Sequence, residues 1–86
     1  MAWIMVVRGS PVPPWRQLAA ILRYRIESGE LEPGAQLPSA LALAGQYGVS
    51  VPTVNKALRS LKADGLVTGV AGYGTFVAAE LPAGDG

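Results

Sequence analysis

Hydrophobic residues recur at helical spacing in two separate segments of this chain. In the segment from Trp15 to about Ser28, the apolar positions that fall on one side of a helix are Leu18, Ile21, Leu22 and Ile26. The i, i+3, i+4, i+7 spacing returns at Val54, Ala57, Leu58 and Leu61. Because polar residues occupy most of the other side in both segments, the pattern predicts two amphipathic helices that each bury one face.

A shorter helix is predicted between these two. The run from Ala40 to Ala44 has high helix propensity, Ser39 before it can accept an amide hydrogen bond, and Gly48 can take the positive φ of a helix end. Ser50 then offers a cap to the following helix, in whose first turn Pro52 removes no helical hydrogen bond. Two helices joined so tightly are typical of a helix-turn-helix.

The segment after the last helix predicts a β-hairpin. Asp64-Gly65 ends the helix, and Leu66 to Val70 and Thr75 to Val77 have the composition of strands. The turn between them runs through residues 71–74, where two glycines allow another backbone to approach closely. A hairpin directly after the third helix would form a wing beside the helix-turn-helix.

The two ends of the chain carry weaker signals. Trp3 to Val7 have the β-branched and aromatic character of a short strand, and the proline-rich stretch up to Pro14 is expected to delay the first helix until after it. The apolar start is too short to span a bilayer and lacks the features of a signal peptide, so no membrane partner is expected. The tail from Ala79 is too small and polar to fold, and we expect it to be disordered.

These elements predict one small domain. The expected fold class is mainly α with a small β-hairpin wing, a winged helix-turn-helix made of three helices plus a short antiparallel sheet. Its expected boundaries are an N-terminal segment over residues 1–14, the domain over residues 15–78 and the tail over residues 79–86.

Composition and charge then narrow the function. The 86 residues include no Cys and no His, so the usual zinc ligands and the commonest general base are missing, and neither a cofactor nor an enzyme is expected. The net charge of +1 hides a division: residues 1–49 carry four basic and three acidic side chains, residues 50–79 carry three and one, and the last two acids follow. The net charge is therefore +1 for residues 1–49 and +2 for residues 50–79, so the part of the chain before the tail is modestly basic at +3.

A set of motifs follows in a fixed order along these elements. They are Ile26 to Gly34, Leu37-Pro38-Ser39, Tyr47-Gly48-Val49-Ser50, Thr53-Val54, Ala57-Leu58, Leu61, Asp64-Gly65-Leu66-Val67 and Gly72 to Val77. From about Trp15 to Val77 the chain resembles the winged helix-turn-helix of GntR-family transcriptional regulators. The resemblance implies a dimeric, operator-binding domain of a bacterial, cytoplasmic repressor, with the third helix in the major groove and the wing tip at the minor groove or backbone.

The candidate DNA-binding residues follow from this arrangement. They are Ser39, Ser50, Pro52, Thr53, Asn55, Lys56, Arg59, Gly72, Tyr73, Gly74 and Thr75. Asn55 is suited to adenine, Thr53 or Pro52 to a thymine methyl group, and the two cations to phosphates. The two serines are helix caps first and phosphate contacts second, the glycines also satisfy a tight hairpin, and Tyr73 stacks, contacts phosphate or stands in solvent.

Departures from the family pattern leave an alternative open. Family members commonly carry basic residues where this chain has Leu41, Val51 and Asn55, so the chain lacks that set of base or phosphate contacts. Leu41, Val51 and the apolar N-terminal segment motivate a second hypothesis, a winged-helix module that binds another protein. Family members also usually continue into an effector-binding domain, so no small-molecule effector is expected for the chain itself.

Overall fold

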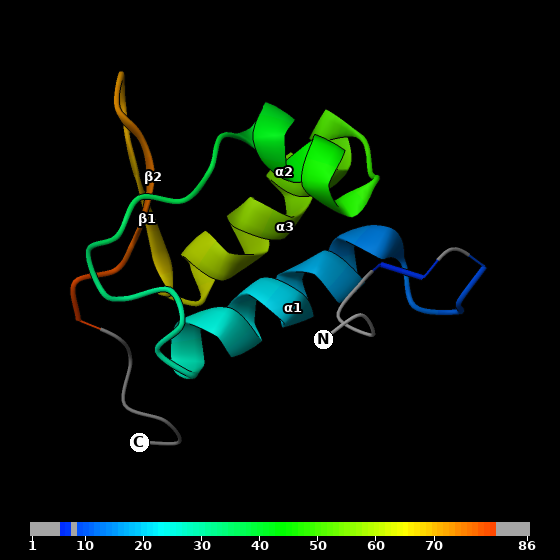
Figure 1. Cartoon of the computed structure of the whole chain (residues 1–86), viewed down its shortest axis with the longest axis horizontal. Helices are drawn as coiled ribbons and strands as arrows, with labels where there is room; N and C mark the ends of the chain where they lie inside the picture. Colours follow the sequence, from blue (N-terminus) through cyan, green and yellow to red (C-terminus); the bar gives the residue numbers. More distant parts are fainter. Residues whose placement is uncertain (1–5, 8, 81–86) are drawn as a thin grey trace.

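The computed structural model describes residues 6–7 and 9–80 and contains three helices and one hairpin. Figure 1 shows α1 (Pro14–Glu27), α2 (Ala40–Tyr47) and α3 (Val51–Ala63), followed by β1 (Val67–Val70) and β2 (Gly74–Val77). The two strands pair antiparallel, from Val67 opposite Val77 to Val70 opposite Gly74. The predicted fold class is confirmed; Gly74, predicted to lie in the turn, is the first residue of β2.

The first helix begins earlier than the sequence predicts. Pro14 is its first residue, so the expectation that the helix starts only after the prolines is wrong by one position. The physical reason is that the first helical amide has no partner within the helix, and proline loses nothing by lacking it. The carbonyl of Pro13 accepts hydrogen bonds from the amides of Arg16 (3.0 Å) and Gln17 (3.1 Å).

The predicted caps define the helix-turn-helix. The Ser39 hydroxyl accepts from the amide of Ala42 at 3.1 Å, and the Ser50 hydroxyl accepts from that of Thr53 at 3.2 Å. Between them Gly48 ends α2 with a φ of 68°, a conformation that costs most other residues energy. Local sequence signals therefore fix both ends of the turn.

The hydrophobic core lies where α1, α2, α3 and the hairpin meet. Its fully buried large side chains are Leu18, Leu22, Ile26, Leu43, Val54, Leu61 and Val77. The two predicted stripes supply most of this list, although Ile21 and Leu58 are only partly buried. Leu41 in the apolar second helix is 75% exposed, so that helix buries only part of its apolar surface.

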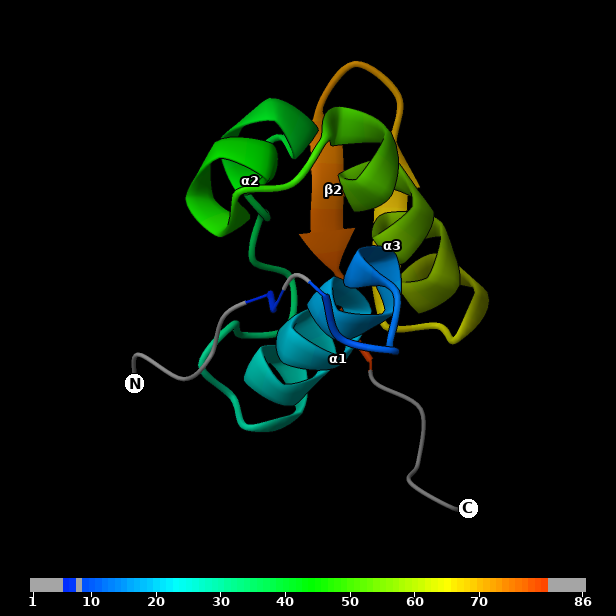
Figure 2. The ribbon, with the colours of Figure 1, turned by 90° about the vertical axis from the view of Figure 1, so that its right-hand side faces the viewer.

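The loop between α1 and α2 adds a third backbone segment to the hairpin. The amide of Leu37 donates to the carbonyl of Thr75 at 2.8 Å, the amide of Val77 donates to that of Ala35 at 2.8 Å, and Gln36 forms a bridge to Phe76. In Figures 1 and 2 the tip of the hairpin lies at the outer edge of the molecule. The loop thus holds the base of the wing against the helices.

The N-terminal segment is held by one side chain of α1. Gln17 accepts a hydrogen bond from the amide of Val7 (2.7 Å) and donates to the carbonyls of Val7 (2.9 Å) and Val12 (2.7 Å). Val6 and Val7 are not in a strand, and the rest of the predicted N-terminal strand lies outside the described residues. Most of the predicted disordered tail, residues 81–86, also lies outside them. Among the described residues, no helix is long and apolar enough to cross a membrane.

Candidate nucleic-acid interface

One side of α3 is buried and the other is open to solvent. Val54, Ala57 and Leu61 face the core, whereas the exposed positions of the helix include Pro52, Asn55, Lys56 and Arg59. This is the division predicted from the sequence. A helix-turn-helix contacts DNA through this second helix, whose N-terminal residues approach the base edges. The exposed side of α3 is therefore the candidate interface.

The N-terminus of α3 is fixed by two hydroxyl groups. The Ser50 hydroxyl accepts from the Thr53 amide and also donates to the Thr53 hydroxyl at 2.9 Å. Thr53 is also half-buried, so both this hydrogen bond and the surrounding packing restrict its side chain. Asn55, by contrast, is exposed and makes no side-chain hydrogen bond with any residue that the structure describes. Its amide group is free to pair with a ligand.

Lys56 is in contact with the first helix. Its ammonium nitrogen lies 4.9 Å from the centroid of the Trp15 ring, within the range of a cation–π interaction. Trp15 is half-buried at the start of α1. Trp15 was not among the predicted site residues, because no local pattern connects two positions so far apart in the chain.

The basic residues of the described chain divide into paired and unpaired groups. Arg23 forms ion pairs with Glu27 (3.6 Å) and with Asp64, while Arg25 pairs with Glu30 (3.3 Å). The cations with no hydrogen bond or ion pair to another described residue are Arg16, Lys56, Arg59 and Lys62.

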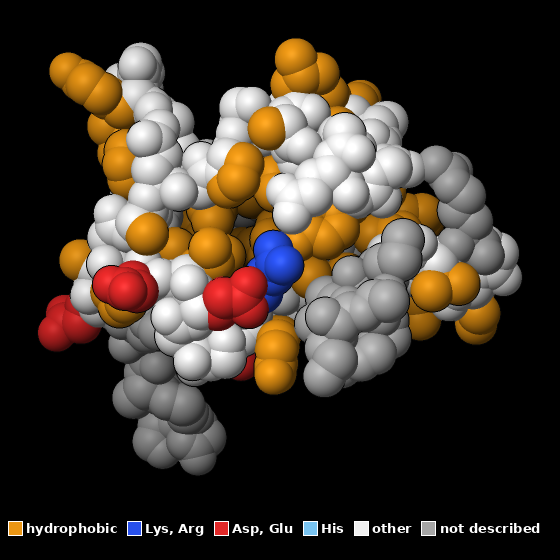
Figure 3. All heavy atoms as spheres, in the orientation of Figure 1, with side chains coloured by type: hydrophobic (Ala, Val, Ile, Leu, Met, Phe, Trp, Pro, Cys, Tyr) orange, Lys and Arg blue, Asp and Glu red, His pale blue; other side chains and the backbone are white. Residues whose placement is uncertain are grey.

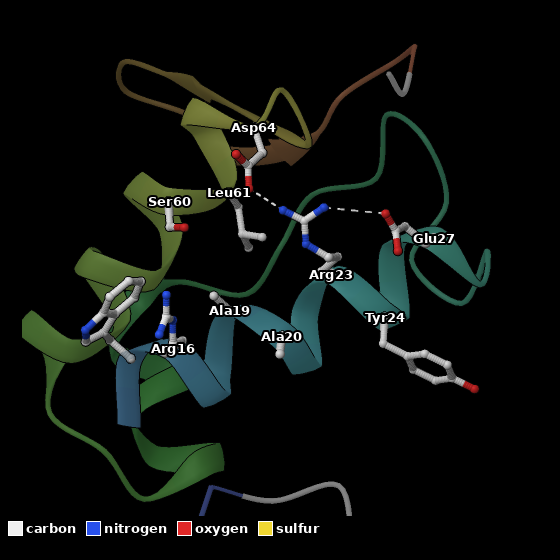
Figure 4. Close-up of a pocket in the computed structure, with 10 residues that line it drawn as sticks. Arg16, Ala19, Ala20, Arg23, Tyr24, Glu27, Ser60, Leu61 and Asp64 are labelled. Carbon is white, nitrogen blue, oxygen red and sulfur yellow. Dashed lines mark hydrogen bonds and ion pairs between the residues drawn. The ribbon is translucent and has the colours of Figure 1, made fainter. Parts of the chain in front are cut away.

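The groove between α1 and α3 brings both groups of cations together. It has a volume of about 430 Å³, and its lining residues include Arg16, Arg23 and Asp64. Figure 4 shows Arg23 between Glu27 and Asp64, with Arg16 further along α1 toward its N-terminus. Arg16 is exposed and was not among the predicted site residues; its position in α1 gave no local signal. Of the two arginines, only Arg16 has no ionic partner among the residues that the structure describes.

The wing tip is shaped by two glycines and one glutamine. Gly72 has a φ of 82° and Gly74 a φ of 123°, so both need a backbone conformation that side chains disfavour. The Gln36 amide donates to the carbonyl of Tyr73 at 2.6 Å, and a Cβ on Gly74 would lie 2.8 Å from the same nitrogen. Gln36 was not predicted from the sequence, because its contact crosses from another loop.

The tip presents an aromatic side chain and no charge. Tyr73 is 74% exposed, and the turn around it contains no acidic residue. Figure 3 shows acidic side chains on the viewed face gathered below the hairpin, with hydrophobic atoms at the tip. Thr75, half-buried in β2, accepts the loop hydrogen bond with its carbonyl. The tip is thus suited to approach a phosphate backbone without electrostatic repulsion.

The predicted residues form two groups in the structure. The first group lies on α3 or at its N-terminal cap and consists of Ser50, Pro52, Thr53, Asn55, Lys56 and Arg59. The second group forms the wing tip and the start of β2 and runs from Gly72 to Thr75. Ser39 caps the other helix of the motif. Both serines act as caps, as predicted, and contact of any of these residues with DNA stays a prediction.

Three helices, a tight turn and a hairpin wing define the class of winged helix-turn-helix domains. The model of the bacterial regulatory proteins of the gntR family matches residues 14–77, and the chain belongs to this GntR family. Among the curated relatives, the repressor NagR of Bacillus subtilis and the repressor MngR of Escherichia coli K12 are each 43% identical over 68 residues. These matches cover 79% of this chain but 28% of each relative, so the chain spans under a third of their length.

Solved structures give the same result for the fold. YtrA from Sulfolobus acidocaldarius, a GntR-family transcription factor, superposes with a TM-score of 0.82 at 36% identity, covering 91% of this chain and 82% of that one. The AraR DNA-binding domain in complex with operator ORX1 gives a TM-score of 0.78 at 32% identity, covering 84% and 93%. The chain therefore shares its architecture with a GntR-family transcription factor and with a DNA-binding domain solved on its operator.

Proposed function

We propose that this chain is a sequence-specific DNA-binding transcription regulator that places α3 in the major groove and the hairpin at the minor groove or backbone. The observation that carries the proposal is the solvent-facing side of α3, where Asn55, Lys56 and Arg59 are exposed and form no side-chain hydrogen bond or ion pair with another described residue. The operator complex of the AraR domain supports it, since that domain shares the fold.

The mechanism is occupancy of an operator by a bacterial, cytoplasmic repressor. Phosphate contacts set the orientation of the domain, and contacts to base edges select the sequence. Two copies bound to half-sites about one helical turn apart would read a palindrome, and we propose a homodimer for this reason. The chain would act without a cofactor and without catalysis, and it would not itself bind a small-molecule effector. The repressors NagR and MngR support the direction of regulation.

Selection of duplexes from a random pool, followed by fluorescence anisotropy at two salt concentrations, tests the proposal. We expect an enriched sequence and an affinity that falls steeply with salt, because each neutralised phosphate releases counterions. The double variant Lys56→Ala, Arg59→Ala should flatten the salt dependence by a slope of about 2. Absence of binding at low salt, with a folded protein, would contradict the proposal.

A second candidate function is the protein-interaction module. Leu41 on α2 is 75% exposed, and exposed large apolar side chains mark protein-binding surfaces when they cluster. A pull-down that recovers a stable protein partner, lost in Leu41→Gln and kept in the double variant of α3, would favour this candidate. Loss of DNA binding in the α3 double variant, with DNA binding kept in Leu41→Gln, would favour the transcription regulator.

A further inference from the structure

The first two turns of α3 carry few groups that can read a base. A recognition helix contacts base edges with its N-terminal residues, and the exposed residues there are Pro52, Asn55 and Lys56. Val51 is half-buried and apolar, and the Thr53 hydroxyl already accepts a hydrogen bond from the Ser50 hydroxyl. The choice of base rests on these few side chains, given that the proposed DNA-binding function holds.

Recognition of guanine has no ready partner in this set. The common contact to guanine is a bidentate Arg or Lys on O6 and N7. Lys56 is the only cation in the first two turns, and its ammonium lies 4.9 Å from the centroid of the Trp15 ring. A contact of this ammonium with a base edge would compete with the cation–π contact, and lysine typically binds phosphate as a compact point charge. Arg59 lies almost one further turn from the N-terminus.

Recognition of an A·T pair has two partners. The Asn55 amide has one donor and one acceptor side, which match N7 and the N6 amino group of adenine, and no other described residue occupies it. Pro52 is exposed, has no N–H and presents only carbon atoms. The apolar group in the major groove is the methyl group of thymine.

We infer that α3 reads A·T base pairs, with Asn55 paired to an adenine and Pro52 packed against the methyl group of a thymine. At the position of Pro52, a G·C pair would place polar base atoms against an apolar ring. At the position of Asn55, the amide group could donate to a guanine acceptor, but its oxygen would find no donor on that guanine edge. Lys56, held by Trp15, contributes a phosphate contact and no base choice. The operator half-site under α3 is therefore defined by adenine and thymine.

Modified bases test this inference with the full chain and the duplex enriched from the random pool. Replacing one thymine at a time by deoxyuridine removes only the methyl group, and we expect about a four-fold loss of affinity at one position. That loss should disappear in Pro52→Ser. Replacing the contacted adenine by 7-deazaadenine should weaken wild type, and Asn55→Ala should bind about 5- to 150-fold more weakly and no longer distinguish the two bases.

A gain of specificity provides the converse result. Asn55→Arg should select guanine at the position where wild type selects adenine, because the guanidinium matches O6 and N7. Circular dichroism melting confirms that each variant is folded. Enrichment of G·C pairs in the half-site, or deoxyuridine that changes nothing at any position, would overturn the inference while the proposed function stands. Failure to enrich any duplex would overturn both.

Discussion

At the scale of single residues, the contact between Trp15 and Lys56 connects α1 to α3. The ammonium lies over a half-buried ring, so the aromatic face limits the directions that a long flexible side chain can take. Lysine loses considerable rotamer entropy when it binds a phosphate, and a side chain restricted beforehand loses less. We therefore expect Trp15 to act as a positioning residue for Lys56 when α3 binds DNA as proposed.

Replacing Trp15 by Leu should weaken DNA binding about 2- to 5-fold, which corresponds to a cation–π contact of about 0.5–1 kcal/mol at an exposed site. Leu keeps most of the apolar bulk that α1 needs, and Trp15→Tyr should restore the affinity because it keeps an aromatic face. Anisotropy titrations of the two single variants, Trp15→Leu and Lys56→Ala, and of the double variant give the coupling. Additive losses would show that Trp15 acts on folding alone.

Two glycines differ sharply in what they tolerate. Gly74 has a φ of 123°, and an added Cβ would meet the Gln36 amide nitrogen at 2.8 Å, so Gly74→Ala should lower the free energy of unfolding by about 1–3 kcal/mol. Gly45 lies exposed within α2 with nothing near its Cβ position, and Gly45→Ala should raise that free energy by about 1 kcal/mol. Urea unfolding of both variants measures the opposite signs. Equal changes in the free energy of unfolding would contradict the conclusion that backbone conformation separates the two glycines.

At the scale of elements, the hairpin depends on a loop that precedes it by two helices. The segment around Gln36 supplies backbone hydrogen bonds to β2 and a side-chain hydrogen bond to the wing tip. The hairpin alone has two strands, and isolated two-stranded hairpins are marginal in water. The loop therefore sets the orientation in which the wing is presented.

The variant Gln36→Glu should loosen the wing, because a carboxylate cannot donate to the Tyr73 carbonyl as the amide does. We expect about 0.5–1.5 kcal/mol less protection of the hairpin amides in hydrogen exchange, and a weaker DNA affinity. Gln46→Glu on the exposed side of α2 adds the same charge without touching the wing and serves as the control. Unchanged exchange at the hairpin in Gln36→Glu would show that the backbone hydrogen bonds alone hold it.

The elements also show which parts of the fold were predictable. Helices, caps and the hairpin follow from signals within a few residues: the spacing of Leu18 and Leu22, the Ser50 cap and the glycines of the turn. The third backbone segment at Gln36 and the contact of Lys56 with Trp15 join positions far apart in the chain. No local period encodes such contacts, so they emerge only when tertiary packing brings the elements together.

At the scale of the whole molecule, charge is divided between two regions. Toward the C-terminus of α1, Arg23 and Arg25 are compensated by carboxylates, whereas Arg16 and the cations of α3 have no ionic partner in the described chain. A net charge of +1 therefore underestimates the attraction that the α3 side exerts on a phosphate backbone. The arrangement of ion pairs decides which arginines are available to a ligand.

Arg16 and Arg23 form a matched pair for testing this division, since both lie on α1 and line the same groove. Arg16→Gln should reduce the slope of log affinity against log salt by about 0.9, because an uncompensated cation that meets a phosphate releases about one counterion. Arg23→Gln should leave the slope unchanged and lower thermal stability, because it removes a cation from Glu27 and Asp64. Titrations at several salt concentrations measure both slopes. Equal slopes for wild type and Arg16→Gln would place the N-terminus of α1 away from DNA.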